Sequence, residues 1–161
     1  LLCAMDVASG MSHLHSMKII HADLKPANVL LKSAHASADD PRGFTCKIAD
    51  FGMARMLSAD DSYISTETLG SLPYLAPEVL QLNKVTKAGD VYSFAVLLLE
   101  MWVGGGAYQD QNYHQVSFAC KIVFCGLRPL VPADMPAAYR ALLEDCWAAD
   151  AKLRPTFDGI L

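Results

Sequence analysis

Hydrophobic residues recur at helical intervals in the first part of the chain, with polar residues between them. Apolar positions three and four apart lie on one face of a helix, so this spacing predicts an amphipathic helix over about the first 17 residues. A longer and almost uniformly apolar stretch at 88–103 predicts a buried helix that ends where glycines follow. The positions that define the first helix are Leu1, Met5, Ala8, Met11 and Leu14.

Short runs of β-branched and apolar residues predict strands between these two helices. Ile19 and Ile20 are predicted to form a very short strand. The runs 29–31 and 45–48 are predicted to pair as a small hairpin, because both are β-prone and a polar segment separates them. That segment, 33–44, is rich in Ser, Ala and Asp, and we expect it to be a solvated insertion loop.

The rest of the chain is predicted to be irregular at first and then helical. Residues 53–76 show no sustained period, and Pro77 can begin a short helix that reaches about Leu82. Further helices are predicted at about 112–125, at about 136–147 and from Thr156 on. The predicted fold class is therefore mainly α with one small β-hairpin.

The composition indicates a globular protein with one core. The 161 residues are 53% hydrophobic and 19% charged, and the formal net charge is -4 with a pI of about 5.6. A protein that binds nucleic acid or an anionic membrane would be expected to carry a basic surface. The charge therefore gives no reason to expect either partner.

The cysteines and the longest apolar run bear on the compartment. Five cysteines, an odd number without a CxxC pair, match neither a disulfide framework nor a zinc site, so we expect a reducing, cytoplasmic environment. The run 91–103 is too short to cross a bilayer and contains Glu100, so no membrane contact is expected from it. The chain begins without methionine inside an apolar periodic stretch, and we expect it to be a piece of a longer protein.

The segment HADLKPANVL, residues 21–30, places an acid, a base and an amide close together. These are Asp23, Lys25 and Asn28. A second acid, Asp50, follows the second strand of the predicted hairpin, and pairing of the strands would bring it near Asn28. Two hard oxygen ligands side by side suit Mg²⁺. Asp23 would stand slightly apart, free to accept a proton. Lys25 would supply a positive charge beside Asp23, where a transferring phosphate would develop negative charge.

Each of these residues also has an interpretation without chemistry. Asp23, Asn28 and Asp50 could be turn residues that hydrogen-bond their own backbone. Asp90, near the start of its helix, could simply be a favourable charge at the positive end of the helix dipole. Other candidate ligands are expected to be ordinary helix positions, with His13 at the surface and His15, Cys120 and Cys125 in the core.

Five motifs, taken in order, resemble the C-terminal lobe of a eukaryotic-type protein kinase. HADLKPAN resembles the catalytic loop, and ADFGMAR resembles the metal-binding loop that opens an activation segment at 50–78, which GSLPYLAPE ends. GDVYSFAVLLLEMW resembles the central buried helix, and CWAADAKLRPTF the signature before the last helix. The motifs cover nearly the whole chain in the family's order, which makes the resemblance specific. It implies that residues 1–161 are a partial kinase domain of α+β class.

The resemblance implies a role for each residue of the catalytic machinery. Asp23 would accept or orient the proton of the substrate hydroxyl, and Lys25 would neutralise the γ-phosphate. Asn28 and Asp50 would hold Mg²⁺ where it bridges the phosphates of ATP. Ser71 stands where the family usually has threonine, and its hydroxyl would bond Asp23 and Lys25.

The resemblance also implies supporting residues and a substrate class. Lys25 followed by Pro26, and the stretch YLAPE, resemble serine/threonine kinases, so the implied substrates are ATP and a protein Ser or Thr. The central and closing motifs resemble the tyrosine-kinase-like group, and the insertion ending in DPRGF is similar to that of its green-algal members. The supporting residues would be Leu30 under the adenine ring, His21 and Phe51 as an apolar spine, Glu78 and Arg154 as a buried ion pair, and Asp90 bonded to amides of the catalytic loop.

Two features depart from the family's pattern. Ala22 replaces the arginine that usually grips a phosphorylated residue of the activation segment, and alanine has no donor for that bond. The sequence holds no Gly-rich loop and no VAIK-like lysine, so we expect the N-terminal lobe to be absent and activity to belong to the full-length parent. The alternatives are a pseudokinase or scaffold that binds partners through this lobe, and a truncated product that never folds stably.

Overall fold

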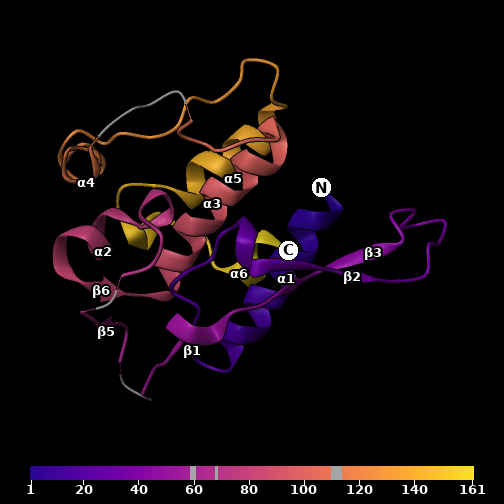
Figure 1. Ribbon diagram of the computed structural model, residues 1–161, viewed down its shortest axis with the longest axis horizontal. Helices are drawn as coiled ribbons and strands as arrows, with labels where there is room; N and C mark the ends of the chain where they lie inside the picture. The colour runs from indigo at the N-terminus through magenta and orange to yellow at the C-terminus, as the bar shows by residue number, and fades with distance from the viewer. Residues whose placement is uncertain (59–60, 68, 110–113) are drawn as a thin grey trace.

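The computed structural model describes residues 1–58, 61–67, 69–109 and 114–161, and it is mainly helical (Figure 1). The helices are α1 (Leu2–Ser16), α2 (Pro77–Leu82), α3 (Lys87–Val103), α4 (Gln115–Phe124), α5 (Ala137–Cys146) and α6 (Phe157–Ile160). The strands are β1 (Ile19–Ile20), β2 (Val29–Ser33), β3 (Phe44–Ile48), β4 (Arg55–Met56), β5 (Ile64–Ser65) and β6 (Lys84–Val85). Short 3-10 turns lie at Pro26–Asn28, Phe51–Met53, Leu72–Tyr74 and Ala151–Leu153.

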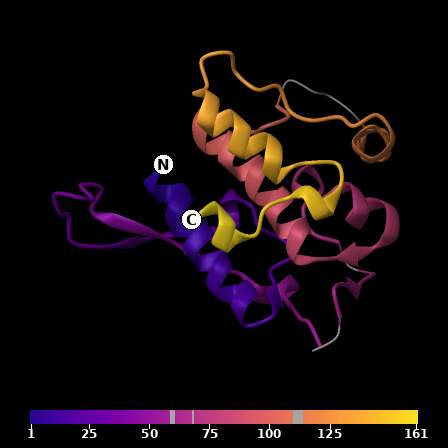
Figure 2. The same cartoon turned by 180° about the vertical axis from the view of Figure 1, so that it is seen from behind.

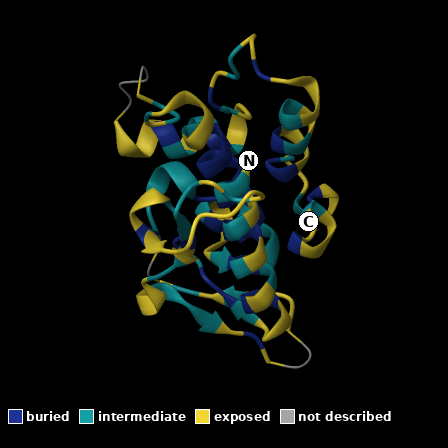
Figure 3. Cartoon of the chain, turned by 90° about the vertical axis from the view of Figure 1, so that its right-hand side faces the viewer, coloured by how far each residue is buried: buried dark blue, intermediate teal, exposed yellow. Residues whose placement is uncertain are grey.

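Helix α3 forms the centre of the core, as its apolar sequence predicts. Its residues from Gly89 to Leu99 are all buried, and α5 runs alongside it in both views of the molecule (Figures 1 and 2). Phe157 of α6 makes edge contacts with His15 of α1 at 5.1 Å and with Phe94 of α3 at 5.3 Å between ring centroids. These ring contacts join α1, α3 and α6 in the core. Figure 3 shows the buried residues in dark blue.

Both ends of α3 are capped by residues visible in the sequence. The Thr86 hydroxyl accepts a hydrogen bond from the Gly89 N–H at 2.8 Å, which satisfies one of the amides that an α-helix leaves free at its start. Gly104 ends the helix in the left-handed region at φ 71°, where glycine carries no Cβ penalty. The predicted end of this helix is confirmed.

The predicted hairpin forms and is longer than expected. Strands β2 and β3 pair antiparallel from Val29 opposite Ile48 to Ser33 opposite Phe44, so each strand takes one end residue of the predicted loop. The hairpin projects from the body of the molecule (Figure 1), but its base is packed firmly. A Cβ added at Gly10 of α1 would lie 3.0 Å from the Ile48 side chain, so glycine allows α1 and β3 to approach closely.

The expectation of a single hairpin was wrong for the described residues. Strand β1 pairs antiparallel with β4, and β5 pairs antiparallel with β6, so three two-stranded sheets are present. Two-residue strands leave no alternating pattern in a sequence, because their pairing depends on distant partners. These ladders hold parts of the segment 53–76, which the sequence predicts to be irregular.

Helix α4 departs most from its predicted environment. It begins at Gln115, and residues 112–113 of the predicted helix lie outside the described residues. The buried residues of α4 are Phe118 and Ile122. Cys120 and Cys125 are exposed, so the prediction that they lie in the core is wrong.

The expected positions of the two histidines are confirmed, since His13 is exposed and His15 is buried. Within the described ranges, no helix combines the length and apolar character that a membrane span requires.

Candidate active site

The loop before β2 is anchored to the core by one buried carboxylate. Asp90 of α3 is 1% exposed and accepts hydrogen bonds from the backbone N–H groups of His21 and Ala22, each at 2.9 Å. It also bonds the His15 ring at 2.9 Å. Ala22 adopts a left-handed φ of 64°, a conformation that a non-glycine residue rarely takes and that the two amide bonds to Asp90 maintain. Asp90 thus holds the loop as well as the helix start.

Asp23 and Lys25 meet Ser71 in a compact polar cluster. Lys25 Nζ donates to Asp23 Oδ2 at 2.7 Å and to the Ser71 hydroxyl at 2.8 Å. The Ser71 backbone N–H donates to Asp23 Oδ1 at 2.8 Å, so Ser71 reaches Asp23 through its main chain and Lys25 through its side chain. The Asn28 amide nitrogen donates to the Asp23 carbonyl at 2.8 Å and to Oδ2 at 3.2 Å. Both carboxylate oxygens are therefore held in place, with Lys25 directly on Asp23.

The surroundings of Asp23 keep its carboxylate ionised. Burial raises the pKa of Asp23. The hydrogen bonds from Lys25 and Ser71 and the positive charge of Lys25 lower it by more, so the pKa of Asp23 lies below its usual value of 3.8. A carboxylate of lowered pKa is a weak base. It is better suited to orienting a hydroxyl and receiving its proton late in a reaction than to removing that proton at the start.

Asn28 and Asp50 lie at the two ends of the hairpin base. The Ala49 N–H donates to the Asn28 carbonyl at 2.9 Å, which places the residue before Asp50 directly against Asn28. Asp50 is exposed, at a left-handed φ of 60°, and its Oδ1 accepts from the Gly52 N–H at 3.2 Å. Because the Asn28 nitrogen donates to Asp23, the amide oxygen is the atom of that side chain left to bind a ligand.

The donor chemistry of this pair fits Mg²⁺. Amide and carboxylate oxygens are hard ligands, and Mg²⁺ commonly takes one or two protein carboxylates and completes its shell with water and phosphate oxygens. Among the described residues, no group of three or more His, Cys, Asp and Glu side chains could hold a metal ion. The Asn28 amide oxygen and the Asp50 carboxylate could supply two ligands of a Mg²⁺ ion whose other ligands come from phosphate and water.

Apolar side chains flank the polar cluster. His21 is fully buried, its Nε2 lies 3.0 Å from the Ala49 carbonyl oxygen, and its ring packs against Phe51 with 5.6 Å between centroids. Phe51 is 50% exposed and Leu30, on β2, is 56% exposed. An open apolar surface therefore adjoins the residues that carry charge.

Gly70 is a site residue that the sequence analysis did not single out. A Cβ at this position would lie 2.6 Å from the Ala22 carbonyl oxygen and 2.9 Å from Asp23 Oδ1, closer than real contacts allow. Glycine therefore lets the segment before Ser71 approach the catalytic loop. The only signal in the sequence was its place directly before Ser71.

Replacing Gly70 by alanine should lower the free energy of unfolding by about 1 to 3 kcal/mol, because the methyl group would clash with the Ala22 carbonyl oxygen and with Asp23 Oδ1. Urea denaturation measures the change. Gly106→Ala is the matched control, since its nearest neighbours would lie 3.9 Å from the new Cβ. Equal stabilities for the two variants would show that the close approach at Gly70 does not matter.

A buried ion pair ties the activation segment to the end of the chain. Arg154, whose side chain is fully buried, donates to both carboxylate oxygens of Glu78 at 2.7 and 2.9 Å. It also donates to the carbonyls of Ala88 and Ala148, each at 2.9 Å. The two-pronged geometry matches the planar guanidinium to the carboxylate. The pair predicted from the sequence is present, and its position makes it structural.

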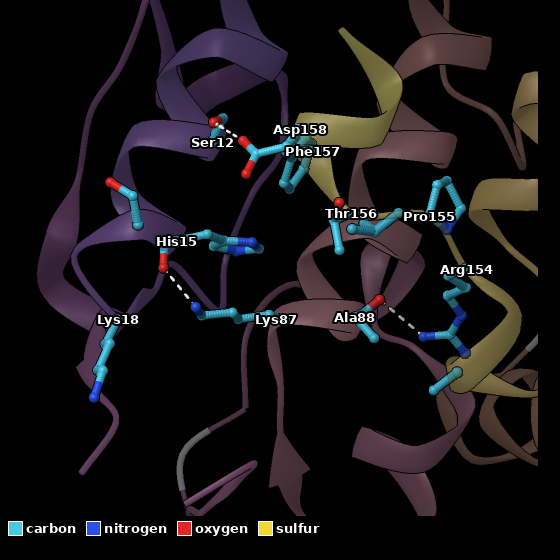
Figure 4. Close-up of a pocket in the computed structure, with 13 residues that line it drawn as sticks. Ser12, His15, Lys18, Lys87, Ala88, Arg154, Pro155, Thr156, Phe157 and Asp158 are labelled. Carbon is cyan, nitrogen blue, oxygen red and sulfur yellow. Dashed lines mark hydrogen bonds between the residues drawn. The ribbon is translucent and has the colours of Figure 1, made fainter. Parts of the chain in front are cut away.

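A cavity of about 510 Å³ lies away from this cluster (Figure 4). Side chains of α1, of the start of α3 and of residues 151–158 line it. Lys87 donates to the His15 carbonyl across it, and Ser12 donates to Asp158. Its connection to the catalytic loop runs through the bond between His15 and Asp90. Arg154 lines this cavity, but none of Asp23, Lys25, Asn28, Asp50 and Ser71 does.

Comparison with known families decides the identity of the chain. All of residues 1–161 match the family described as protein tyrosine and serine/threonine kinase. The chain belongs to this protein kinase family. The HADLKPAN segment, which resembles the catalytic loop of this family, is the segment whose backbone bonds Asp90 of α3.

Relatives of known description support the assignment. A probable LIM domain-containing serine/threonine-protein kinase of Dictyostelium discoideum is 36% identical over 157 residues, which cover 98% of this chain and 22% of the relative. The serine/threonine-protein kinase STY17 of Arabidopsis thaliana is 36% identical over 158 residues, covering 98% and 25%. Ephrin type-A receptor 7 of Gallus gallus is 34% identical over 158 residues, covering 96% and 15%. The kinase chain thus spans a quarter or less of these relatives' lengths.

Proposed function

We propose that this chain is the C-terminal lobe of an ATP- and Mg²⁺-dependent protein serine/threonine kinase of the tyrosine-kinase-like group, and that its parent acts in the cytoplasm. The cluster of Asp23, Lys25 and Ser71 carries the proposal, because it fixes an ionised carboxylate beside a positive charge. The activity is assigned to the full-length parent. The five free cysteines support the proposed location.

Each residue of the cluster has a part in the proposed transfer. Asp23 orients the substrate hydroxyl and receives its proton as the bond to phosphorus forms. Lys25 stabilises the negative charge that develops on the transferred group. Asn28 and Asp50 supply oxygen ligands for Mg²⁺, which when bound neutralises the phosphates of ATP. Leu30 offers an exposed apolar side chain against which the adenine ring can pack.

Phosphoamino acid analysis tests this proposal. The full-length parent is incubated with γ-labelled ATP, Mg²⁺ and a mixed protein substrate, and the labelled residues are separated after acid hydrolysis. We expect phosphoserine or phosphothreonine, because the DLKPAN loop resembles serine/threonine kinases and two relatives carry that description. Label on tyrosine alone would refute the acceptor class. No transfer above a metal-free control would favour the pseudokinase or scaffold.

The activation segment is held by contacts that need no phosphate. Strand β5 pairs with β6, and the Thr66 N–H donates to the Asn83 carbonyl at 3.0 Å. Lys84 Nζ lies 4.0 Å from the centroid of the Tyr63 ring, within the range of a cation–π contact. Ala22 offers only a methyl group where a phosphate-binding arginine would stand. These contacts favour an arrangement of residues 63–66 that needs no modification.

Treatment of the parent with a phosphatase should therefore change its kinase rate by less than about two-fold, since Ala22 lacks the charged donor that would bind a phosphate. The rate before and after treatment is compared, with loss of phosphate verified by mass spectrometry. A large loss of activity would contradict the expectation. The sites considered are Ser58, Ser62, Ser65, Thr66 and Thr68, of which Thr68 lies outside the described residues.

A further inference from the structure

Two cysteines from distant parts of the chain share one network of charged groups beside the hairpin. Cys3 lies on α1 and is half-buried, whereas Cys46 lies in the middle of β3 and is 5% exposed. Burial, followed by the contact with the Cys3 side chain, raises the pKa of the Cys46 thiol to about 12. Cys46 therefore keeps its proton at neutral pH, while Cys3 is the member of the pair that solvent can reach.

A network of charged groups fixes the position of both cysteines. Arg42 Nη1 donates to the Cys3 sulfur at 3.3 Å, and the same guanidinium pairs with Asp6 at 3.0 Å and with Asp40 at 2.6 Å. Asp6 in turn accepts a hydrogen bond from the Cys46 N–H at 2.9 Å. A guanidinium at a sulfur stabilises negative charge on it, and this is the environment in which cysteines react with peroxides.

We infer that Cys3 and Cys46 form a modification site, a dithiol that hydrogen peroxide oxidises to a reversible disulfide joining α1 to the hairpin. Cys3 is the thiol that reacts first with peroxide, since it is partly accessible and contacts Arg42. Cys46 is the resolving thiol, since it is buried and its N–H bonds Asp6, the partner of the same Arg42 that contacts Cys3. The inference concerns only these thiols and is independent of the proposed kinase activity.

The chemistry balances with peroxide as the oxidant. The Cys3 thiolate attacks one peroxide oxygen, so that an S–O bond forms, the O–O bond breaks, and hydroxide leaves and takes up a proton as water. Cys46 then gives up its proton as its sulfur attacks the Cys3 sulfenic acid. The S–S bond forms, the S–O bond breaks, and a second water leaves. Two thiols lose two electrons to one peroxide, and a dithiol reductant reverses the change.

The bond would restrain the part of the fold that carries Asp50. Cys46 is two residues from Ile48, the residue packed against Gly10 of α1, and β3 leads directly into the ADFG turn. A covalent link at this point would hold β3 on α1. It would also close a long loop of chain, which in the chain-entropy account stabilises the folded state.

The other three cysteines lack this arrangement. Cys120 and Cys125 are exposed near the end of α4, and Cys146 is fully buried in the core. Burial raises the pKa of Cys146 to about 12. Exposed thiols without a buried partner are expected to react singly, so Cys120 provides a matched control for the pair.

Peptide mapping of the oxidised protein tests the inference. The full-length parent, folded in native buffer, is treated with hydrogen peroxide at stoichiometric to ten-fold excess, blocked with iodoacetamide and digested with trypsin. We expect a linked species made of the peptide that ends at Lys18 and the peptide 43–47, which a reductant separates into its two parts. It should be absent from Cys3→Ser and from Cys46→Ser and present in Cys120→Ser. The Arg42→Gln variant loses the tryptic cut after residue 42, so its linked species contains the peptide 33–47. This variant should form the disulfide at least about five-fold more slowly.

Thermal melting of the same samples supplies a second readout. Oxidised wild-type protein should melt roughly 5 to 10 °C higher than reduced protein, and Cys46→Ser should show no such difference. The inference is overturned if Cys3 and Cys46 are recovered unlinked while Cys120 and Cys125 are consumed. It is equally overturned if the linked peptide forms only in urea, since the native arrangement would then play no part.

Discussion

Replacing Asp23 by asparagine in the full-length parent should lower the rate of phosphate transfer by about 10²- to 10⁴-fold, the range that a positioned base contributes. Asparagine has almost the same shape and can still accept the hydrogen bond that the Ser71 N–H now gives to Asp23 Oδ1. It carries no negative charge for Lys25 and cannot receive a proton. The turnover number with a saturating protein substrate is the quantity to measure.

A matched variant separates this chemistry from a general loss of structure. Asp134→Asn makes the same substitution at an exposed position far from the cluster, so it should leave the turnover number unchanged. Thermal melting of Asp23→Asn shows whether the variant is folded. If the folded variant keeps wild-type turnover, Asp23 has no role in the transfer and the proposed mechanism is wrong.

Replacing Glu78 by alanine should lower the free energy of unfolding by about 3 to 5 kcal/mol, because it leaves the charge of a buried guanidinium without its partner. The Arg154 side chain has no exposed surface, and its hydrogen bonds to the Ala88 and Ala148 carbonyls and its contact with the Tyr92 ring would not replace the lost carboxylate. Urea denaturation of the parent, followed by the fluorescence of the kinase domain, measures the change.

A double-mutant cycle tests the origin of that loss. Combining Glu78→Ala with Arg154→Met should destabilise the protein by less than the sum of the two single changes, because the second removes the charge that the first leaves unpaired. Glu144→Ala, at an exposed position on α5, is the control and should stay within about 0.5 kcal/mol of wild type. If Glu78→Ala lowers the free energy of unfolding by less than about 1 kcal/mol, water or other groups must stabilise the charge of Arg154 in place of Glu78.

Local patterns were sufficient for the long elements of this fold. The limits of α1 and α3 were predicted nearly correctly from their apolar residues. Residues three and four apart lie on the same face of a helix, so the pattern that defines a helix is local. The hairpin was predicted because two β-prone runs flank a polar loop. Strands β4, β5 and β6 were not, since a two-residue strand is defined by its partner across the sheet.

The motif residues were found in the sequence, but their arrangement was only partly anticipated. Asp23, Lys25 and Asn28 share one loop, so their proximity follows from the sequence itself. Lys25 was expected beside Asp23, and the Ser71 hydroxyl was expected to bond both. The hydroxyl bonds Lys25, whereas Asp23 accepts the backbone N–H of Ser71 from 48 residues away. The close approach of Gly70 depends on the same long-range contact.

The sequence by itself determined the helices, the hairpin and the set of chemical groups, since periodicity and motif spacing are local properties of the chain. The tertiary structure alone decided contacts that no motif implied: Gly70 against the Ala22 carbonyl, the Ser71 N–H on Asp23, and the Cys46 N–H on Asp6. The physical reason is that a buried charge or thiol takes its partners from whatever segments the core brings together. Such partners have no fixed spacing along the chain, so only the folded arrangement reveals them.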